Sequence, residues 1–332
     1  MTPSEQWFDF DETEYYEQQG DHQKLKHQFI ETYMHIWVEN VGYHSKHNIP
    51  TVDFFDLYAA SGWATNEDQT ETWHGSALIL AKSFGEYPNS RLLFLNTYNE
   101  NKEIEDRQAE ILKKSIQELE DCPHVYPNTY FCRKEILEAT SDAISELNRA
   151  FPSVWILDPY APSQLPWEVI QSISTAIGNY LNRKGEQVER RPEIIITLMT
   201  SVLQRFSELK PDMIKIAFNM DEEEWRERFS YYAKLWKSRR IEHPTRHVVL
   251  DIYLEKLSEY YYLPILVILV PGKQGQIVYA MIHCTNNPAG HYLMKKKLTE
   301  GFGGYIVYEW GKGIGLKQIL TGGQKTLDHH FQ

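Results

Sequence analysis

Runs of β-favouring residues that alternate with stretches of helical periodicity constrain the fold of this chain more than any other feature. Apolar residues recur at helical spacing over residues 76–84, 103–119 and 136–147. A strand, a helix and a further strand in this order form a right-handed βαβ unit, so we predict an α/β fold with a mostly parallel sheet. The expected strands are Val52–Ala59, Leu92–Leu95, Thr129–Cys132, Val154–Asp158 and Glu193–Met199.

In the second half of the chain, strand and helix patterns no longer alternate regularly. Residues 221–240 and 247–261 have helical patterns without a strand between them. Two β-rich runs, Pro264–Val270 and Gln276–Cys284, flank a short turn-rich link and predict an antiparallel hairpin. We expect an acidic segment at 1–21, one domain at 22–300 with a helical insertion at about 205–262, and an extension at 301–332.

Composition excludes several classes. A net charge of −12 argues against bulk non-specific binding of nucleic acid, although a local basic groove remains compatible with it. The three cysteines are too scattered for a disulfide framework, which favours reduced thiols and a cytoplasmic location. The longest apolar run is strand-sized and the N-terminus is acidic, so neither a membrane span nor a signal peptide is expected.

The stretch from Val52 to Gly62 predicts a ligand site. It reads as a strand that ends near Asp56, followed by a turn with a single glycine, and an apolar helical run begins after Gly75. A nucleoside- or phosphate-bearing cofactor is usually bound at the first crossover of an α/β sheet, where glycine lets the backbone approach the ligand. In this chain the turn is Ala59-Ala60-Ser61-Gly62, so it keeps only one glycine and the motif is partly altered.

Several segments, in this order, resemble the three-Cys-motif partner proteins. They are the acidic start with Lys26-His27, the stretch from Asp56 to Gly62, Gly75-Ser76, Asp158-Pro159-Tyr160, and Asn287-Pro288-Ala289-Gly290. That family is similar to class I S-adenosylmethionine-dependent methyltransferases and is named for its occurrence beside a radical-SAM-like protein with three cysteines. The resemblance implies a three-layer Rossmann-like methyltransferase fold, in which a mostly parallel sheet is closed by an antiparallel β-hairpin.

The resemblance also implies a site for S-adenosylmethionine. Its cofactor-binding residues would be Asp56, the loop Ala59-Ala60-Ser61-Gly62, Asn96 and Glu135. Methyltransferases usually end the second strand with a carboxylate that binds the ribose hydroxyls, and here Asn96 falls near that place without a charge. In methyltransferases the third strand often ends in an acid beside the adenine amine. Glu135 lies near that place and would serve there only if the register of the strand end were shifted. The methyl group of Ala60 would crowd the cofactor.

Asp158-Pro159-Tyr160 is the candidate catalytic segment. In amino-methyltransferases a related acid-Pro-Pro-aromatic motif holds an exocyclic amine, and the aromatic ring stacks on the flipped base. Here one proline precedes the tyrosine, so the match is partial. The structural alternative is that Asp158 caps the turn after the strand. Asp56 could likewise cap the turn after its strand instead of binding the cofactor.

Other candidates carry weaker signals. His283 and Thr285 end the last strand of the hairpin, and a structural histidine is the favoured interpretation. No metal site is expected at His243 and His247, because Pro244 lies between them and no third ligand is identifiable. A basic-aromatic cluster could contact nucleic acid or form a solvated helix face. Its basic residues are Lys234, Lys237, Arg239, Arg240 and Arg246.

Two functions follow from these observations. In the first, the protein is a methyltransferase-like enzyme that acts on an amine of a nucleobase or nucleotide. In the second, it keeps the fold but has lost catalysis, and it acts as a partner or regulatory subunit of a radical-SAM-like three-Cys-motif protein. The altered loop favours the second function, and the retained Asp56, Gly62 and Asp158-Pro159-Tyr160 favour the first.

Overall fold

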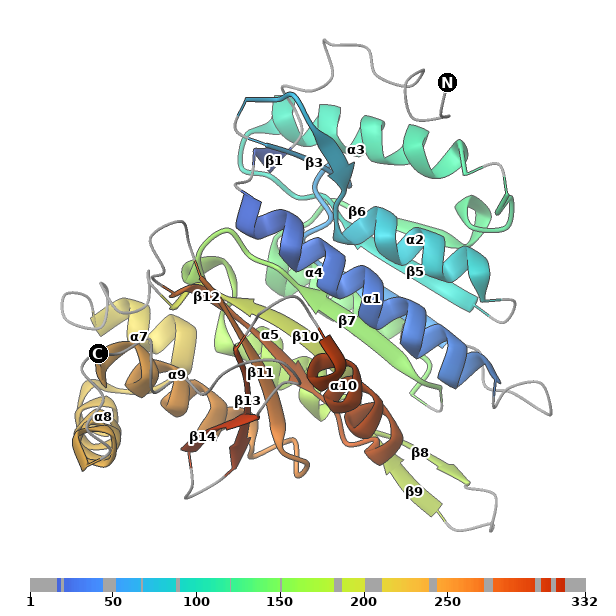
Figure 1. The fold of residues 1–332 in the computed structure, drawn as a ribbon. Coiled ribbons are helices and arrows are strands. Elements are labelled where there is room, and N and C mark those ends of the chain that lie inside the picture. The colour runs from blue at the N-terminus through green and yellow to red at the C-terminus, as the bar shows by residue number, and fades with distance from the viewer. Residues whose placement is uncertain are drawn as a thin grey trace. The chain divides into compact units, whose positions relative to one another are not determined.

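The fold is described by a computed structural model in two compact units, Met1–Ile156 and Leu157–Gln332. Figure 1 shows the chain coloured from its N-terminus to its C-terminus. The residues described are 17–18, 21–43, 52–66, 68–87, 90–119, 121–149, 151–181, 187–200, 211–238, 244–271, 277–301, 306–311 and 315–319.

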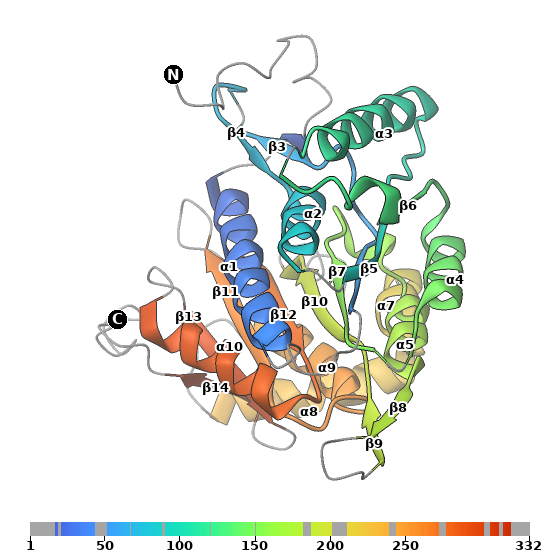
Figure 2. The same ribbon diagram turned by 90° about the vertical axis from the view of Figure 1, so that its right-hand side faces the viewer.

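The first unit contains a parallel sheet. Its strands lie in the order β7-β2-β5-β6, and each neighbouring pair is parallel. Figure 2 shows α2 and α4 on opposite sides of β5 and β7, which gives three layers. The elements are α1 (Asp21–Tyr43), β2 (Val52–Asp56), α2 (Ser76–Glu86), β5 (Ser90–Asn96), α3 (Lys102–Gln117), the short helix η4 (Tyr126–Asn128), β6 (Thr129–Cys132), α4 (Ile136–Glu146) and β7 (Ser153–Leu157).

Strand β2 is buried on both faces, as expected of a central parallel strand. Successive side chains point to opposite faces of the sheet. The ring of Phe54 packs edge-on against Trp37 of α1 and Phe84 of α2. The ring of Phe55 stacks on Trp155 of β7, with 3.9 Å between the ring centroids. Aromatic packing on both faces therefore fixes the strand from which the candidate loop begins.

A small second sheet interrupts the predicted turn-to-helix step. Strands β1 (Glu17–Gln18), β3 (Trp63–Thr65) and β4 (Thr72–His74) form it, with β3 and β4 antiparallel. Trp73 ties this sheet to α1, because its Nε1–H donates to Nδ1 of His27 at 2.9 Å. The chain thus makes a short hairpin after Gly62 and only then begins α2.

The second unit contains an antiparallel sheet in the order β14-β13-β11-β12-β10. A separate hairpin pairs β8 with β9. The elements are the short helix η5 (Pro162–Gln164), α5 (Trp167–Thr175), β8 (Gly178–Leu181), β9 (Gln187–Arg190), β10 (Glu193–Leu198), α7 (Pro211–Phe218), α8 (Glu222–Ser238), α9 (Pro244–Leu257), β11 (Ile265–Pro271), β12 (Ile277–Cys284), α10 (Pro288–Gly301), β13 (Ile306–Gly311) and β14 (Gly315–Ile319).

The predicted fold class is confirmed: the protein is α/β and Rossmann-like, with a mostly parallel central sheet, flanking helices and a closing antiparallel hairpin. The C-terminal extension supplies two further strands, since β13 pairs with β11. The domain limits at 21, about 205–262 and 300 stay predictions, and most of segment 1–21 lies outside the described residues. Within the described ranges, no helix is long and apolar enough to cross a membrane.

Candidate functional site

The loop after β2 is a compact turn built by its own hydrogen bonds. The Asp56 carboxylate is fully buried, and its Oδ1 accepts from the N–H of Tyr58 at 2.9 Å. The carbonyl of Ala59 accepts from the N–H of Gly62 at 2.9 Å. Ser61 Oγ donates to the carbonyl of Trp63 and accepts from its N–H. Asp56 and Ser61 therefore stabilise the turn itself, whatever else they bind.

The loop uses left-handed backbone at Ala60, with φ +43°, and at Gly62, with φ +76°. An L-residue other than glycine pays roughly 1 kcal/mol for this conformation, so Ala60 is strained where a glycine would not be. A Cβ on Gly62 would come within 2.6 Å of Leu112 and 2.9 Å of Leu78. Glycine at position 62 is thus required by packing against α2 and α3 as well as by the turn.

Gly75 brings the start of α2 against this loop. Its N–H donates to the carbonyl of Gly62 at 2.8 Å, and a Cβ on Gly75 would lie 3.1 Å from that oxygen. Among the described residues, the N–H groups of Ala60 and Ser61 donate to no protein acceptor. Consecutive backbone N–H groups in such a turn form a site that favours an anionic group.

Asn96 joins three strand ends. Its side-chain Nδ2 donates to the carbonyls of Leu57 and Lys134, at 3.3 and 3.1 Å, and its Oδ1 accepts from the N–H of Lys134 at 3.2 Å. Its own carbonyl accepts from the N–H of Ala59 at 2.9 Å. Both amide protons of this buried side chain are therefore committed to the protein, which leaves a structural role that the sequence did not indicate.

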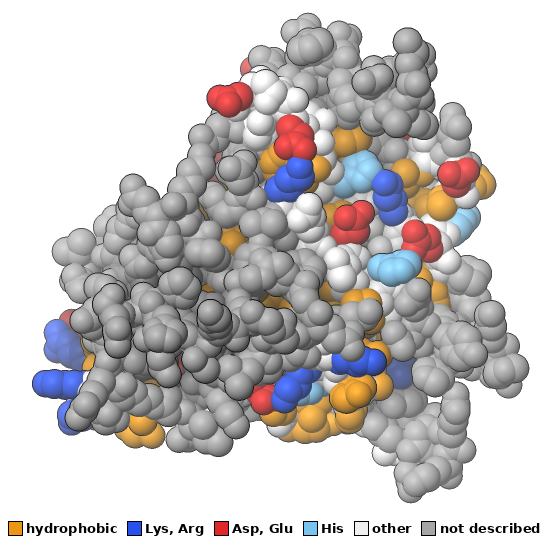
Figure 3. Space-filling model, viewed as in Figure 1, with side chains coloured by type: hydrophobic (Ala, Val, Ile, Leu, Met, Phe, Trp, Pro, Cys, Tyr) orange, Lys and Arg blue, Asp and Glu red, His pale blue; other side chains and the backbone are white. Residues whose placement is uncertain are grey.

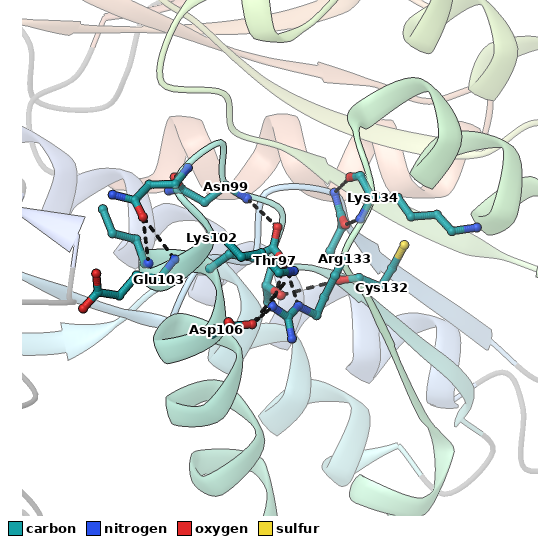
Figure 4. Close-up of polar contacts among 12 residues, drawn as sticks. Thr97, Asn99, Lys102, Glu103, Asp106, Cys132, Arg133 and Lys134 are labelled. Atoms are coloured by element: carbon teal, nitrogen blue, oxygen red, sulfur yellow. Dashed lines mark hydrogen bonds and ion pairs between the residues drawn. The ribbon is translucent and has the colours of Figure 1, made fainter.

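Four charged side chains fasten the end of β6 to the start of α3 (Figure 4). The buried Glu105 carboxylate accepts from Lys102 Nζ at 2.5 Å and from Arg133 Nε at 2.8 Å, and Arg133 also pairs with Asp106. Burial alone would raise the pKa of Glu105, but the hydrogen bonds from Lys102 and Arg133 hold it below the usual value. The network holds the loop after β5, because Glu105 Oε2 accepts from the N–H of Asn99 at 3.3 Å.

Glu135 is differently placed. It is exposed, and in the described part of the chain it pairs with no cation; the hydroxyl of Tyr98 donates to its Oε1 at 3.4 Å. Partial desolvation, followed by the charge of Glu135, raises the pKa of Tyr98. The ring of Tyr98 is 40% exposed at the end of β5. This tyrosine, which the sequence did not single out, therefore stands beside the accessible carboxylate at the same strand ends.

Asp158-Pro159-Tyr160 directly follows β7, in the second unit. Pro159 is buried and Tyr160 is 53% exposed. The N–H groups of Tyr160 and Ala161 donate to Oε1 of Gln164, at 2.9 and 3.2 Å. Gln164 therefore contributes to capping this turn.

The structure supports a structural role for His283. Its Nε2 lies 2.9 Å from Oε1 of Glu193, and both side chains are buried. Because β12 runs antiparallel to β10, with Cys284 opposite Ile194, the end of β12 meets the beginning of β10. In the part of the chain that is described, no three His, Cys, Asp or Glu side chains form a group that could hold a metal ion.

The predicted basic cluster is described only in part. Lys234 and Lys237 are exposed on α8, Arg239 and Arg240 lie outside the described residues, and the side chain of Arg246 is not described. Elsewhere, Figure 3 shows basic, acidic and histidine side chains interspersed over α1 and α2. That mixture gives no continuous basic surface on the described part of this face. All three cysteines are free thiols.

No family model matches the chain, and no curated protein matches it in sequence. Solved structures resemble its fold at low identity. A Legionella pneumophila protein of the family model DUF519 aligns with 12% identity and a TM-score of 0.45, over 86% of this chain and 98% of that chain. A Corynebacterium glutamicum protein described as a probable spermidine synthase aligns with 10% identity and a TM-score of 0.39, over 88% of this chain and 82% of that chain. A Klebsiella pneumoniae protein described as an O-methyltransferase aligns with 9% identity and a TM-score of 0.38, over 76% of this chain and 79% of that chain.

Proposed function

We propose that this chain is a methyltransferase-like protein that binds S-adenosylmethionine at the carboxyl ends of β2, β5 and β6 and acts on an amine of a nucleobase or nucleotide. A kinship with the three-Cys-motif partner proteins is part of the proposal. One observation carries it: the left-handed loop after β2 leaves the N–H groups of Ala60 and Ser61 without a protein acceptor, and Asn96 joins this loop to the strand end that carries Glu135.

The donor set fits the chemistry of the cofactor. S-adenosylmethionine carries a carboxylate at one end and a ribose and an adenine amine at the other, and it supplies an electrophilic methyl group when bound. The N–H groups of Ala60 and Ser61 would bind the carboxylate. Glu135 would accept hydrogen bonds from the nucleoside, with the exposed ring of Tyr98 beside it. Asn96, whose amide protons are already used, would orient the loops without binding ribose.

Asp158, Pro159 and Tyr160 would hold the substrate. A carboxylate that accepts a hydrogen bond from an exocyclic amine directs the lone pair of the nitrogen towards the methyl group, and an exposed tyrosine ring offers a stacking surface for the base. Gln164 accepts hydrogen bonds from the N–H groups of Tyr160 and Ala161 in the same turn. The turn-cap role of Asp158 is the alternative, and the Asp158→Ala variant separates the two.

The second function has an observation of its own. Ala60 keeps a Cβ in a left-handed position, and Asn96 replaces an acid with an amide that is used internally. Both features would weaken cofactor binding, as expected for a partner or regulatory subunit of a radical-SAM-like protein. The partner proposal predicts that the purified chain forms a stable complex with that protein.

The decisive functional test is methyl transfer from methyl-labelled S-adenosylmethionine to DNA, RNA and free nucleotides. The enzyme proposal predicts transfer to an exocyclic amine by the unaltered chain. Absence of transfer to all three substrates, together with a stable complex with the radical-SAM-like protein, would favour the partner function. A contact with nucleic acid through the basic cluster predicts that Lys234→Glu with Lys237→Glu weakens oligonucleotide binding and flattens its salt dependence.

A further inference from the structure

The loop after β2 is fastened to helix α3 through Trp63, the residue that directly follows the loop. The indole Nε1–H of Trp63 donates to Oγ of Ser115 at 2.8 Å. Ser115 belongs to α3, and both ribbon views show β3, which begins at Trp63, beside that helix (Figures 1 and 2). The two residues are 52 positions apart in the sequence, so this hydrogen bond is a tertiary contact and not part of the local turn.

Ser115 is suited to this contact by a hydrogen bond of its own. Its hydroxyl donates to the carbonyl of Ile111, one turn earlier in α3, at 2.9 Å. The single hydroxyl proton is then used, and the lone pairs of Oγ remain to accept from Trp63. Serine in a helix interior contributes little to helix stability. The contact with Trp63 therefore explains a hydroxyl on this face of α3 better than helix propensity does.

Trp63 is also bonded to the loop itself. Oγ of Ser61 accepts from the N–H of Trp63 at 3.3 Å and donates to its carbonyl at 3.2 Å. Gly62, between them, packs against the same helix, since a Cβ there would come within 2.6 Å of Leu112 Cδ1. Leu112 precedes Ser115 by three positions, so both lie on one face of α3. Two neighbouring points of α3 therefore fix the end of the loop.

The indole ring of Trp63 has a further partner in the neighbouring strand. Trp63 is opposite His74 in the pair of β3 and β4, with 4.7 Å between the ring centroids. Gly75, the next residue, donates its N–H to the carbonyl of Gly62 at 2.8 Å. The hairpin of β3 and β4 thus starts and ends at the loop. The ring is held at the base of this hairpin, where the chain leaves the loop.

We infer that Trp63 and Ser115 are positioning residues for the carboxylate of the bound nucleoside, an inference that rests on the proposed function. The N–H groups of Ala60 and Ser61, which donate to no acceptor in the described part of the protein, must converge on one anionic group to bind it. In this role Trp63 and Ser115 do not touch the ligand. They hold the backbone of Ser61, so the ligand loses little binding energy in ordering the loop. The site then favours nucleosides that carry an amino-acid carboxylate.

Calorimetric titration of the full chain with two ligands tests this role. S-adenosylmethionine carries the carboxylate, whereas methylthioadenosine has the same nucleoside and lacks the carboxylate. Trp63→Phe keeps an aromatic ring and removes the Nε1–H, and Ser115→Ala removes its acceptor. Each should weaken binding of S-adenosylmethionine by about fivefold, near the net contribution of one hydrogen bond, and leave methylthioadenosine binding nearly unchanged. The double variant should bind like the single variants, because all three lack the same hydrogen bond.

Trp73→Phe is the matched control. It removes another indole hydrogen bond of the same hairpin, from Trp73 to Nδ1 of His27 at 2.9 Å. It should leave the binding of both ligands nearly unchanged, and melting curves should show that every variant is folded.

The inference is overturned if Trp63→Phe and Ser115→Ala weaken the binding of both ligands equally or of neither, or if Trp73→Phe has the same effect as they do. It is also overturned if the unaltered chain binds methylthioadenosine as tightly as S-adenosylmethionine, because the loop then recognises no carboxylate although the nucleoside site stands. If the unaltered chain binds neither ligand, the proposed function fails and this inference fails with it.

Discussion

The side chain of Asn96 and the backbone of Lys134 exchange two hydrogen bonds, with Nδ2 donating to the carbonyl at 3.1 Å and Oδ1 accepting from the N–H at 3.2 Å. The side-chain amide thereby makes the pair of hydrogen bonds that a backbone peptide group makes in a β-sheet, beyond the point where β5 and β6 separate. It also reaches the carbonyl of Leu57, after β2. A neutral amide with both donor and acceptor functions is needed for this, which explains why no acid occupies the position.

Asn96→Asp tests that explanation. A carboxylate would face the carbonyl oxygens of Leu57 and Lys134 and could donate to neither. We expect a loss of roughly 2 kcal/mol or more in unfolding free energy at pH 7, because two buried acceptors lose their donor. Urea unfolding of the two proteins measures it. If Asp at this position instead leaves stability unchanged and tightens S-adenosylmethionine binding, Asn96 is a replaced ribose ligand and our account of it is wrong.

Arg91→Ala should be strongly destabilising at neutral pH. The Asp53 carboxylate is fully buried and accepts from Arg91 Nε at 2.8 Å and Nη2 at 2.6 Å. Removal of the guanidinium leaves a buried charge, which costs roughly 3–5 kcal/mol. Arg107→Ala breaks a surface pair with Glu110 and should cost under about 1 kcal/mol.

The Arg91→Ala effect should also depend on pH. Burial already raises the pKa of Asp53 despite Arg91, and loss of Arg91 would raise it further. A raised carboxyl pKa favours folding when the group is protonated, so the penalty should shrink as the pH falls towards the pKa of the variant. A penalty that is the same at pH 7 and pH 4.5 would contradict this description of Asp53.

Two neutral histidines should make the first unit sensitive to acid. Burial, followed by the charge of Lys82, lowers the pKa of His74 to about 4. Burial, followed by Lys26, lowers the pKa of His27 well below its usual value, and its Nδ1 accepts from Trp73. Depressed pKa values give stability that is present above about pH 6.5 and is lost as the pH falls towards the folded-state pKa, by up to about 1.4 kcal/mol per pH unit for each histidine.

Chemical unfolding at pH 7.5, 6 and 5 checks this expectation. His74→Gln and His27→Gln should each flatten the dependence of unfolding free energy on pH. His35→Gln, at a side chain that is 65% exposed on α1, should not. An unchanged slope in both buried-histidine variants would show that other groups cause the acid sensitivity.

Asp158→Ala separates substrate contact from turn capping. If Asp158 orients the target amine, the change should abolish methyl transfer while cofactor binding and folding stay nearly intact, since its contribution appears in the transition state. If it caps the turn, melting should show a loss of roughly 1 kcal/mol and any activity should survive. The proposed function predicts the first result. Both measurements belong on the same sample.

The parts of the fold that follow hydrophobic periodicity were predictable. Strand β6 has its predicted bounds, and α2 begins at the predicted Ser76. The strands β3 and β4 were not predicted, because three-residue strands carry too little periodicity to be recognised. Strand β13 was missed for a different reason: its pairing with β11 is a long-range contact that no local pattern encodes.

The candidate site was predictable in position but less so in detail. Residues that end successive parallel strands had to lie at one edge, and Asn96 does join the ends of β2 and β6 there. The hydrogen-bond partners of Asn96 could not be read from its own neighbourhood, since Leu57 and Lys134 are distant in sequence. Tyr98 gave no signal either, because an exposed tyrosine after a strand has no distinctive spacing.

Calorimetric titration of S-adenosylmethionine into the full chain tests the central claim most directly. We predict weak binding with one site per chain, about fivefold tighter for Ala60→Gly, because this change removes the methyl group that would crowd the bound cofactor. Glu135→Gln should weaken binding, and Glu138→Gln, at an exposed acid one turn further along α4, should leave it unchanged. If neither the unaltered chain nor the folded Ala60→Gly variant binds, or if Glu135→Gln and Glu138→Gln bind alike, the edge formed by β2, β5 and β6 is not a site for this cofactor.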